Sequence, residues 1–289
     1  MLDIKILKPS KNQTMSSSVL YHTKGRKAYI TLNRPERFNA INHTLPSEIE
    51  AAVQKANDNP SIHVIILQGA GKAFCSGYDL KEYAEKPRPQ IGSQNMPWDP
   101  TIDYKMMKRN TEQFMSLWRS YKPTICKIHG YAVAGGSDIA LCCDIVIMAE
   151  NAKIGYPPAR LWGCPTTMMW VYRLGAEKAK RMLLTGDLVT GREAYDMGLV
   201  YKSCPQEQLE KEVENLADRM ASIPQNQLMM QKMVINQAYN QMGIETTQMI
   251  ATLFDGITRH SPEGVAFKAR CEEVGFKQAV IERDSGHKL

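Results

Sequence analysis

The sequence lacks several patterns that mark common classes of protein. No run of apolar residues in the 289-residue chain is long enough to span a bilayer. Residues 1–12 alternate charged and apolar positions and lack the continuous apolar stretch of a secretory signal. We therefore expect a protein that has no membrane partner and works in the cytoplasm.

Cysteine patterns typical of metal sites or disulfide frameworks are also missing. The seven cysteines are irregularly spaced, and although Cys142 and Cys143 are adjacent, no C-x-x-C pair occurs. We expect buried, reduced thiols and no bound metal.

The chain has no complete motif for a nucleotide cofactor. No G-x-G-x-x-G opens a helix after a strand, which argues against a nicotinamide cofactor. Gly71-Lys72 suggests a phosphate loop, but Ile66 stands where that motif needs its first glycine and Ala73 where it needs Ser or Thr. We therefore expect no cofactor.

Charge is modest and evenly spread. The net charge of +6 comes without a long basic run or a dense aromatic–basic stretch, so nucleic acid is not the expected partner. With 43% hydrophobic and 23% charged residues, the chain can form a large folded core.

A strand that turns sharply into a helix lies near the middle of the chain. Residues 124–133 are rich in β-favouring and apolar side chains, Gly135-Gly136 follows, and 137–143 is mostly apolar. Glycine allows close backbone approach, and a helix start presents unpaired N–H groups that can hold a developing negative charge. Asp138 would lie in the first helical turn. A turn that serves only packing, with an acidic residue complementing the helix dipole, explains the same residues.

A second stretch upstream repeats this arrangement. A strand over 62–67 ends in glycines before Lys72-Ala73-Phe74-Cys75-Ser76-Gly77-Tyr78-Asp79-Leu80-Lys81-Glu82. The two stretches together resemble those of the crotonase (enoyl-CoA hydratase/isomerase) superfamily, and the resemblance runs from about Tyr29 to the last predicted helix.

The resemblance implies an α/β fold, a crotonase-like spiral of ββα repeats with a C-terminal helical trimerisation region. It implies an N-terminal arm over 1–18, a core over 19–205 with the CoA-thioester site, and a helical oligomerisation region over 206–289. In crotonases that region packs against neighbouring subunits, which implies a homotrimer or a dimer of trimers.

Apolar patterning predicts the individual elements. Strands are expected over 19–21, 28–32, 62–67, 124–133, 144–149, 152–156 and 200–202. Helices are expected over 45–57, 102–122, 137–143, 166–174, 176–184, 192–197, 206–222, 224–241, 245–260 and 262–283. The loop over 84–101 is expected to be either a lid over the acyl end of the substrate or disordered.

The resemblance also implies the site. The N–H groups of Tyr78 and Gly135 would hold the thioester oxygen, and Asp138 would move a proton. The implied acyl-CoA contacts are Arg34, Phe38, Asn39, Ala40, Cys75, Ser76, Gly77, Asp79, Leu80, Gly136, Tyr156, Pro158, Trp162, Phe267 and Lys268. In the family, the segment matching Phe267-Lys268 can reach CoA from an adjacent subunit; a plain surface lysine is the alternative.

One departure from the family pattern affects the predicted reaction. Hydratases of the family use two glutamates; the first falls on Asp138, and the second falls near Pro158-Ala159, where neither residue can transfer a proton. Each positioned acid or base contributes roughly 10²–10⁴-fold, so hydration is weak unless Tyr156 or another group substitutes.

The predicted function is that of an enoyl-CoA hydratase or isomerase that stabilises a thioester enolate. A hydrolase of a β-keto or cyclic acyl-CoA is the nearest enzymatic alternative. A catalytically weak family member that binds CoA or RNA is the alternative from a different class.

Overall fold

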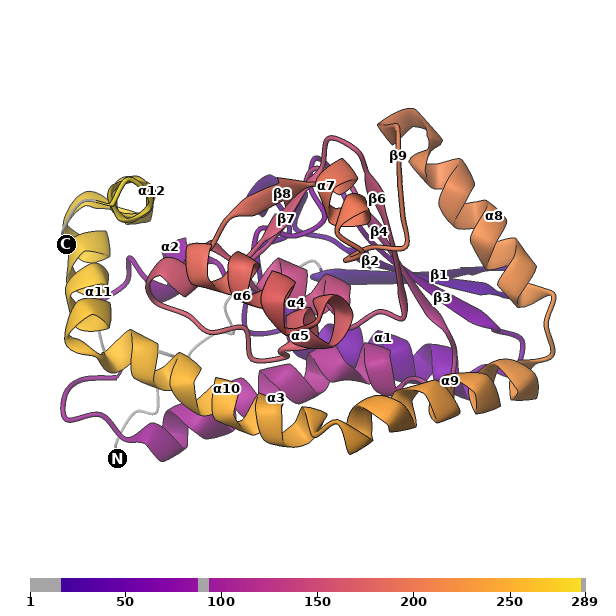
Figure 1. Ribbon diagram of the computed structural model, residues 1–289, viewed down its shortest axis with the longest axis horizontal. Coiled ribbons are helices and arrows are strands. Elements are labelled where there is room, and N and C mark those ends of the chain that lie inside the picture. The colour runs from indigo at the N-terminus through magenta and orange to yellow at the C-terminus, as the bar shows by residue number, and fades with distance from the viewer. Residues whose placement is uncertain (1–16, 88–93, 287–289) are drawn as a thin grey trace, which may run out of the picture.

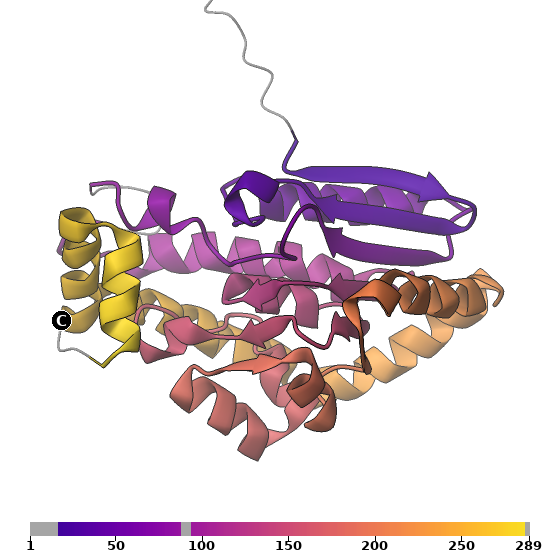
Figure 2. The same cartoon turned by 90° about the horizontal axis from the view of Figure 1, so that it is seen from above.

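Two β-sheets form the centre of the molecule. The structure, a computed structural model, describes residues 17–87 and 94–286. The larger sheet has the order β1-β2-β3-β4-β6-β9, in which only the β1–β2 pair is antiparallel. Its strands are β1 (Val19–Lys24), β2 (Lys27–Leu32), β3 (Val64–Gly69), β4 (Thr124–Ile128), β6 (Ile145–Ala149) and β9 (Lys202–Cys204). Figure 2 shows β1–β3 along one side of the molecule.

The sequences of the central strands, such as β3 and β6, are almost continuously apolar because helices cover both faces of the sheet. Helix α1 packs against β1 and β2, while α8 packs against β3, β4 and β6. A smaller sheet of β5 (Tyr131–Val133), β7 (Lys153–Gly155) and β8 (Leu188–Thr190) lies beside the larger one. This mixture of parallel strands and helices confirms the α/β prediction.

The helices follow the strands and then continue alone to the C-terminal side. They are α1 (Leu45–Asp58), α2 (Leu80–Tyr83), α3 (Pro100–Arg119), α4 (Gly135–Leu141), α5 (Met169–Leu174), α6 (Ala176–Thr185), α7 (Gly191–Asp196), α8 (Leu209–Ala221), α9 (Gln225–Gln241), α10 (Ile244–His260), α11 (Pro262–Val274) and α12 (Phe276–Asp284). Figure 1 shows α9 and α10 along the lower side, with α10 beside α3 and with α11 and α12 at one end.

Three predicted elements need correction. The single strand expected over 124–133 is two strands in different sheets, because the chain turns at Gly130, which has a φ of 62°. The single helix over 262–283 is broken at Gly275, with a φ of 82°. The helix expected from residue 166 begins at Met169, after Met168 in the left-handed region. Strand β8 was not predicted.

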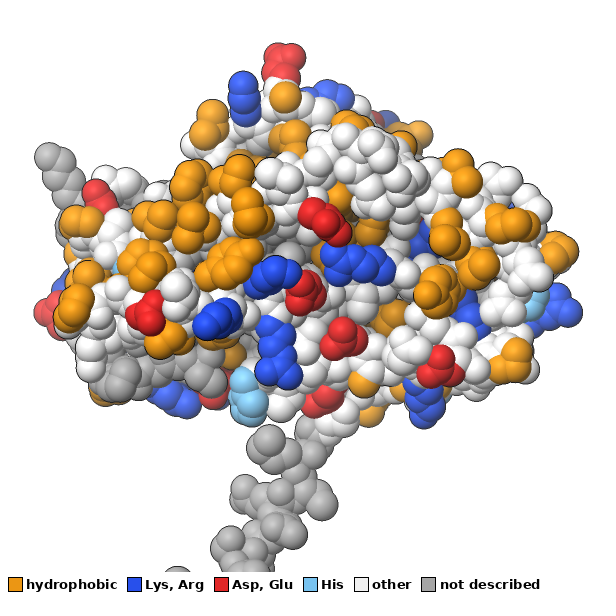
Figure 3. Space-filling view, turned by 90° about the horizontal axis from the view of Figure 1, so that it is seen from below, with side chains coloured by type: hydrophobic (Ala, Val, Ile, Leu, Met, Phe, Trp, Pro, Cys, Tyr) orange, Lys and Arg blue, Asp and Glu red, His pale blue; other side chains and the backbone are white. Residues whose placement is uncertain are grey.

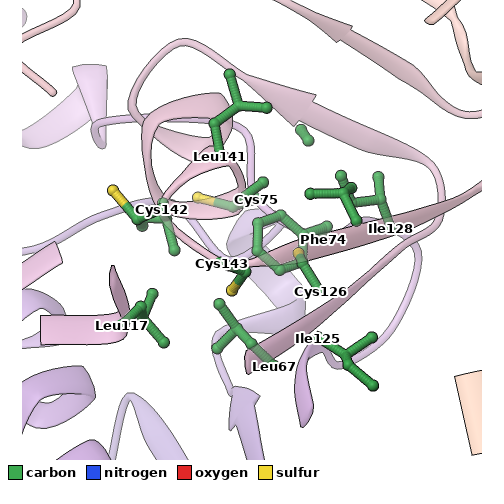
Figure 4. Close-up of a cluster of buried hydrophobic side chains, with 14 of the residues drawn as sticks. Leu67, Phe74, Cys75, Leu117, Ile125, Cys126, Ile128, Leu141, Cys142 and Cys143 are labelled. Carbon is green, nitrogen blue, oxygen red and sulfur yellow. The ribbon is translucent and has the colours of Figure 1, made fainter. Parts of the chain in front are cut away.

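The core below the two glycine turns is filled by Phe74 and its neighbours. Figure 4 shows Phe74 among Leu67, Ile128 and the side chains of Cys126 and Cys143. All five are fully buried, and all seven cysteines of the chain are free thiols. This packing fixes the ends of β3 and β4, from which the two turns start.

A buried ion pair joins the helical region to the sheet. Lys232 on α9 lies 2.8 Å from Asp144 Oδ2, and the same oxygen accepts a hydrogen bond of 2.7 Å from the Thr124 N–H. The Lys232 ammonium also donates to the carbonyl oxygens of Leu117 and Lys122. Asp144 therefore ties β4 and the start of β6 to α9.

Replacing Asp144 by alanine should destabilise the fold, because it leaves the Lys232 charge buried without its carboxylate. We expect the free energy of unfolding in urea to fall by about 3–5 kcal/mol. Asp196→Ala, which removes an exposed pair with Arg192, is the control and should lose far less. Equal losses in the two variants would contradict this account.

Candidate functional site

A cavity lies where the two glycine turns meet the C-terminal helices. Its walls come from the turns, α2, α3, the loop after β7, α10, α11 and the end of α12. The lining residues are Ser76, Tyr78, Leu80, Tyr83, Met106, Met107, Asn110, Ala134, Gly135, Tyr156, Pro158, Trp162, Gly163, Asp255, Arg259, Phe267 and Arg283. The cavity therefore combines a mostly apolar wall with a few polar groups, as is typical of a small-molecule site.

The two turns are held against each other by backbone hydrogen bonds. Cys75 donates its N–H to Tyr131 O at 2.8 Å, and its carbonyl accepts from the Val133 N–H at 3.0 Å. On the other side of the first turn, Gly77 O accepts from the Ile41 N–H at 2.8 Å. These bonds fix the position of Tyr78 relative to Gly135.

Close backbone approach explains the glycines. A Cβ at Gly77 would lie 2.9 Å from Val133 O and 3.4 Å from the Gly135 nitrogen, and Gly77 has a φ of 91°. A Cβ at Gly136 would lie 2.3 Å from Cys75 O. A side chain at either position would push the turns apart.

Two backbone N–H groups remain available at this contact. In the described part of the chain, neither the Tyr78 N–H nor the Gly135 N–H donates a hydrogen bond, while the N–H groups of Cys75 and Asp79 both do. Both residues line the cavity. Since buried N–H groups are nearly always paired, two unused donors at one cavity are suited to a ligand oxygen.

Asp138 lies in the first turn of α4, behind the Gly135 wall. It is not among the lining residues, and 3% of its surface is exposed. The Thr167 hydroxyl donates a 2.6 Å hydrogen bond to its Oδ1. Burial raises the pKa of Asp138 to about 8, although the Thr167 bond opposes this shift. At neutral pH the group is therefore mostly a carboxylic acid that can give up a proton.

The loop after β7 carries no acidic side chain. Tyr156 is 95% buried and lines the cavity. Burial raises the pKa of Tyr156 well above its usual range, so the phenol stays protonated. Pro158 and Trp162 line the cavity beside it.

Charged residues at the cavity were missed in the sequence. Asp255 and Arg259 on α10 both line it, and Arg259 Nη2 lies 2.9 Å from Asp255 Oδ2 and 2.9 Å from Asp103 Oδ2. The sequence feature that could have indicated this ion pair is the spacing of Asp255 and Arg259, four residues apart on one predicted helix. From the sequence alone, residues 245–260 are assigned only to the oligomerisation region.

The residues of the 34–40 loop, expected to contact the CoA moiety, lie outside the cavity lining. Arg34 donates to Ala40 O and forms a 3.0 Å ion pair with Asp79, and buried Asn39 donates to the carbonyl oxygens of Ala70 and Ala73. Phe38 is 47% exposed at a left-handed position with a φ of 49°. Arg34, Asn39 and Asp79 therefore stabilise the loops, and Phe38 presents an aromatic ring at the surface.

The predicted residues differ in their relation to the cavity. Those that line it are Ser76, Tyr78, Leu80, Gly135, Tyr156, Pro158, Trp162 and Phe267. Those that do not are Arg34, Phe38, Asn39, Ala40, Cys75, Gly77, Asp79, Gly136, Asp138 and Lys268.

The Phe267-Lys268 segment is buried in its own chain. Phe267 packs on Trp162, with ring centroids 5.5 Å apart. Lys268 is fully buried, and its ammonium donates to Lys86 O and Glu272 Oε1 at 2.5 Å each. The alternative of a surface lysine is therefore wrong.

The loop proposed as a lid is described only in part, because residues 88–93 lie outside the described residues. In the described part, the Trp98 ring stacks on His260 at 4.6 Å, and Asp99 caps α3. Neither residue lines the cavity.

Two broader expectations concern membranes and metals. Within residues 17–87 and 94–286, no helix is long and apolar enough to cross a membrane. In the same ranges, no three His, Cys, Asp or Glu side chains gather into a group that could hold a metal ion.

Comparisons with known proteins agree with the motifs. The family model for enoyl-CoA hydratase/isomerase matches residues 23–272. The chain is 34% identical over 219 residues to a probable mitochondrial enoyl-CoA hydratase of Dictyostelium discoideum, covering 75% of this chain and 74% of that protein. The chain belongs to the enoyl-CoA hydratase/isomerase family, which confirms the predicted class of enzyme.

Solved structures confirm the crotonase-like fold. An enoyl-CoA hydratase from Mycobacterium smegmatis is 46% identical and superposes with a TM-score of 0.87, covering 93% of this chain and 94% of that one. An enoyl-CoA hydratase/isomerase from Xanthobacter autotrophicus Py2 is 29% identical with a TM-score of 0.85, covering 95% of this chain and 100% of that one.

The raised pKa of Asp138 predicts a pH-dependent stability difference. Its value rises from 3.8 to about 8 on folding, so the folded state binds the extra proton and loses stability as pH rises through this range. In the Asp138→Asn variant, the amide side chain at this position does not titrate. The variant's free energy of unfolding relative to wild type should therefore rise between pH 4 and pH 8, by at most about 1.4 kcal/mol per pH unit. Urea unfolding across this range measures it, and a constant difference would refute the shift.

Proposed function

We propose that the protein acts on acyl-CoA thioesters by stabilising an enolate, as an enoyl-CoA hydratase or isomerase. The observation that carries this proposal is the pair of unused N–H groups, on Tyr78 and Gly135, at one wall of the cavity. The names of the relatives, enoyl-CoA hydratases, support a thioester as the ligand. The thioester oxygen would accept both hydrogen bonds.

The two donors act most strongly on the charged state of the reaction. Polarising the thioester carbonyl acidifies the neighbouring carbon, and the enolate that forms carries its negative charge on the oxygen between the two N–H groups. Removing one donor of this kind typically costs about 10²–10³ in rate. The backbone bonds of Cys75 and Gly77 hold the donors in place before substrate arrives.

Asp138 is the proposed proton carrier for the carbon next to the thioester. With a pKa of about 8, it holds a proton at neutral pH yet releases it readily, as general acid–base catalysis requires. The Thr167 hydroxyl fixes Oδ1, which leaves Oδ2 for the proton. Asp138 follows the cavity-lining Gly135 by three residues, and the proposal requires Oδ2 to reach the substrate past this residue.

The CoA moiety would lie over the outer loops. Exposed Phe38 offers a surface for an aromatic base, and the loop of Arg34 and Ala40 is held rigid by their mutual hydrogen bond. No residue of this loop lines the acyl cavity, which fits a contact with the distant part of the ligand.

Asp138→Asn tests this proposal. In deuterated water, wild type should exchange the α-proton of a saturated acyl-CoA, and the variant should lose at least 100-fold in exchange rate because the amide cannot carry the proton. Mass spectrometry measures exchange, and calorimetric titration with the same thioester should give an affinity within about threefold of wild type.

Asp196→Asn serves as the control for exchange, since Asp196 is an exposed residue at the end of α7. Unchanged exchange in Asp138→Asn removes that residue from its role. Free CoA as the main product would instead favour the hydrolase. Salt-sensitive RNA retention without any exchange would favour the binding protein.

We also propose that the chain assembles as a homotrimer or a dimer of trimers. Large apolar side chains are exposed along α9 and α10: Met230, Met233, Val234, Ile235, Met242, Met249, Ile250, Leu253, Phe254 and Ile257. Figure 3 views the molecule from the side along which these helices run and shows hydrophobic side chains gathered over much of it. So large an apolar surface is typical of subunit contacts.

Light scattering after size exclusion should therefore give a mass of three or six chains. Val234→Glu and Ile235→Glu together place charges on exposed apolar positions and should lower the mass towards one chain, because burying them costs more than the contact gains. Circular dichroism shows whether the chain stays folded. A monomeric wild type would refute the proposed assembly.

A further inference from the structure

The cavity lining includes an acidic residue, Asp255, that the family motifs do not account for. Asp255 reaches it from α10, far along the chain from the loop after β7, where family hydratases carry their second glutamate. The same loop holds Asp255 in place, because the Cys164 N–H donates a 3.0 Å hydrogen bond to Asp255 Oδ1. The carboxylate thus lies directly beside the segment that lacks an acid.

This carboxylate and the Tyr156 hydroxyl both lie next to Gly163. A Cβ at Gly163 would lie 3.5 Å from Tyr156 Oη and 3.7 Å from Asp255 Oδ1, so both atoms surround one point of the cavity wall. Burial is the main cause of the raised pKa of Tyr78 and of Tyr156, and the charges of Asp255 and Asp138 raise both further. Both carboxyl groups therefore act electrostatically on the tyrosines that line the cavity.

The ion pair with Arg259 gives Asp255 different surroundings from those of Asp138. Burial raises the pKa of Asp255, but the guanidinium 2.9 Å from its Oδ2 opposes this by favouring the anion. Asp138 has no cationic partner among the described residues and is mostly protonated at neutral pH. Two acidic groups in different environments can act as a base and an acid in one reaction.

We infer that Asp255 is the second catalytic carboxylate of this enzyme and that it holds and deprotonates the water added to a 2-enoyl-CoA. The inference rests on the proposed function. The water gives a proton to Asp255 as its oxygen bonds to the β-carbon, and the electron pair of the double bond moves to the α-carbon and the thioester oxygen. Asp138 then protonates the α-carbon, and solvent returns the proton from Asp255 to Asp138. The net reaction adds one water.

Asp255→Asn and Asp103→Asn are a matched pair of variants. Both aspartates are buried and both lie 2.9 Å from Arg259 Nη2, but only Asp255 lines the cavity. Each variant removes one negative charge beside the guanidinium, so a purely structural role predicts similar effects from both.

The experiment measures two reactions in each variant. Hydration is followed with crotonyl-CoA, trans-2-octenoyl-CoA and trans-2-dodecenoyl-CoA, using the one that wild type hydrates fastest. Exchange of the α-proton for deuterium is followed with the saturated thioester of the same length. Asp255→Asn should lower kcat for hydration at least 100-fold while exchange stays within about threefold of wild type, and Asp103→Asn should leave both within about threefold.

Several results would overturn the inference. Hydration above one tenth of wild type in Asp255→Asn, or equal losses in both variants, would make Asp255 structural. A wild type that exchanges the α-proton but hydrates none of the three thioesters would refute the inference while the enolate proposal stands. A wild type that does neither would refute the proposed function itself.

Discussion

The contact between two glycine turns is the constraint on which the site depends. The backbone of Gly77 and Tyr78 lies against that of Ala134 and Gly135 so closely that a Cβ at Gly77 would clash with Val133 O. Hydrogen bonds from the surrounding strands hold the two turns together, and the N–H groups of Tyr78 and Gly135 remain available at the cavity. The buried core around Phe74 fixes the strand ends that carry both turns.

The sequence was informative where local geometry decides the structure. Gly77, Gly135 and Gly136 predicted close backbone approach, and the paired motifs predicted the family and the fold. Asp138 in the first helical turn was likewise expected. Each of these features depends on residues that are near one another in the chain, where spacing and turn chemistry are readable.

Contacts between segments that are far apart in the chain could not be predicted from local sequence patterns. Asp255 and Arg259 come to the cavity on α10, and their partner Asp103 lies on α3. The sequence patterns of both helices are those of ordinary amphipathic elements. The sequence suggests for Lys268 either a CoA contact or a surface position, and its burial could not be predicted because its acceptor, Lys86 O, lies far away in sequence. The break between α11 and α12 was missed because Gly275 sits inside an otherwise helical pattern.

The C-terminal helices thus contribute residues to the cavity and also expose apolar side chains at the surface. Phe267 and Arg283 close the cavity, and Asp255 supplies charge, while the outer faces of α9 and α10 expose apolar side chains. The most direct test of the central claim is the carbonyl stretching frequency of a bound, ¹³C-labelled acyl-CoA thioester, measured by Raman difference spectroscopy. If the N–H groups of Tyr78 and Gly135 both donate to its oxygen, the frequency should fall below that of the free thioester in water; an unchanged frequency would contradict the account.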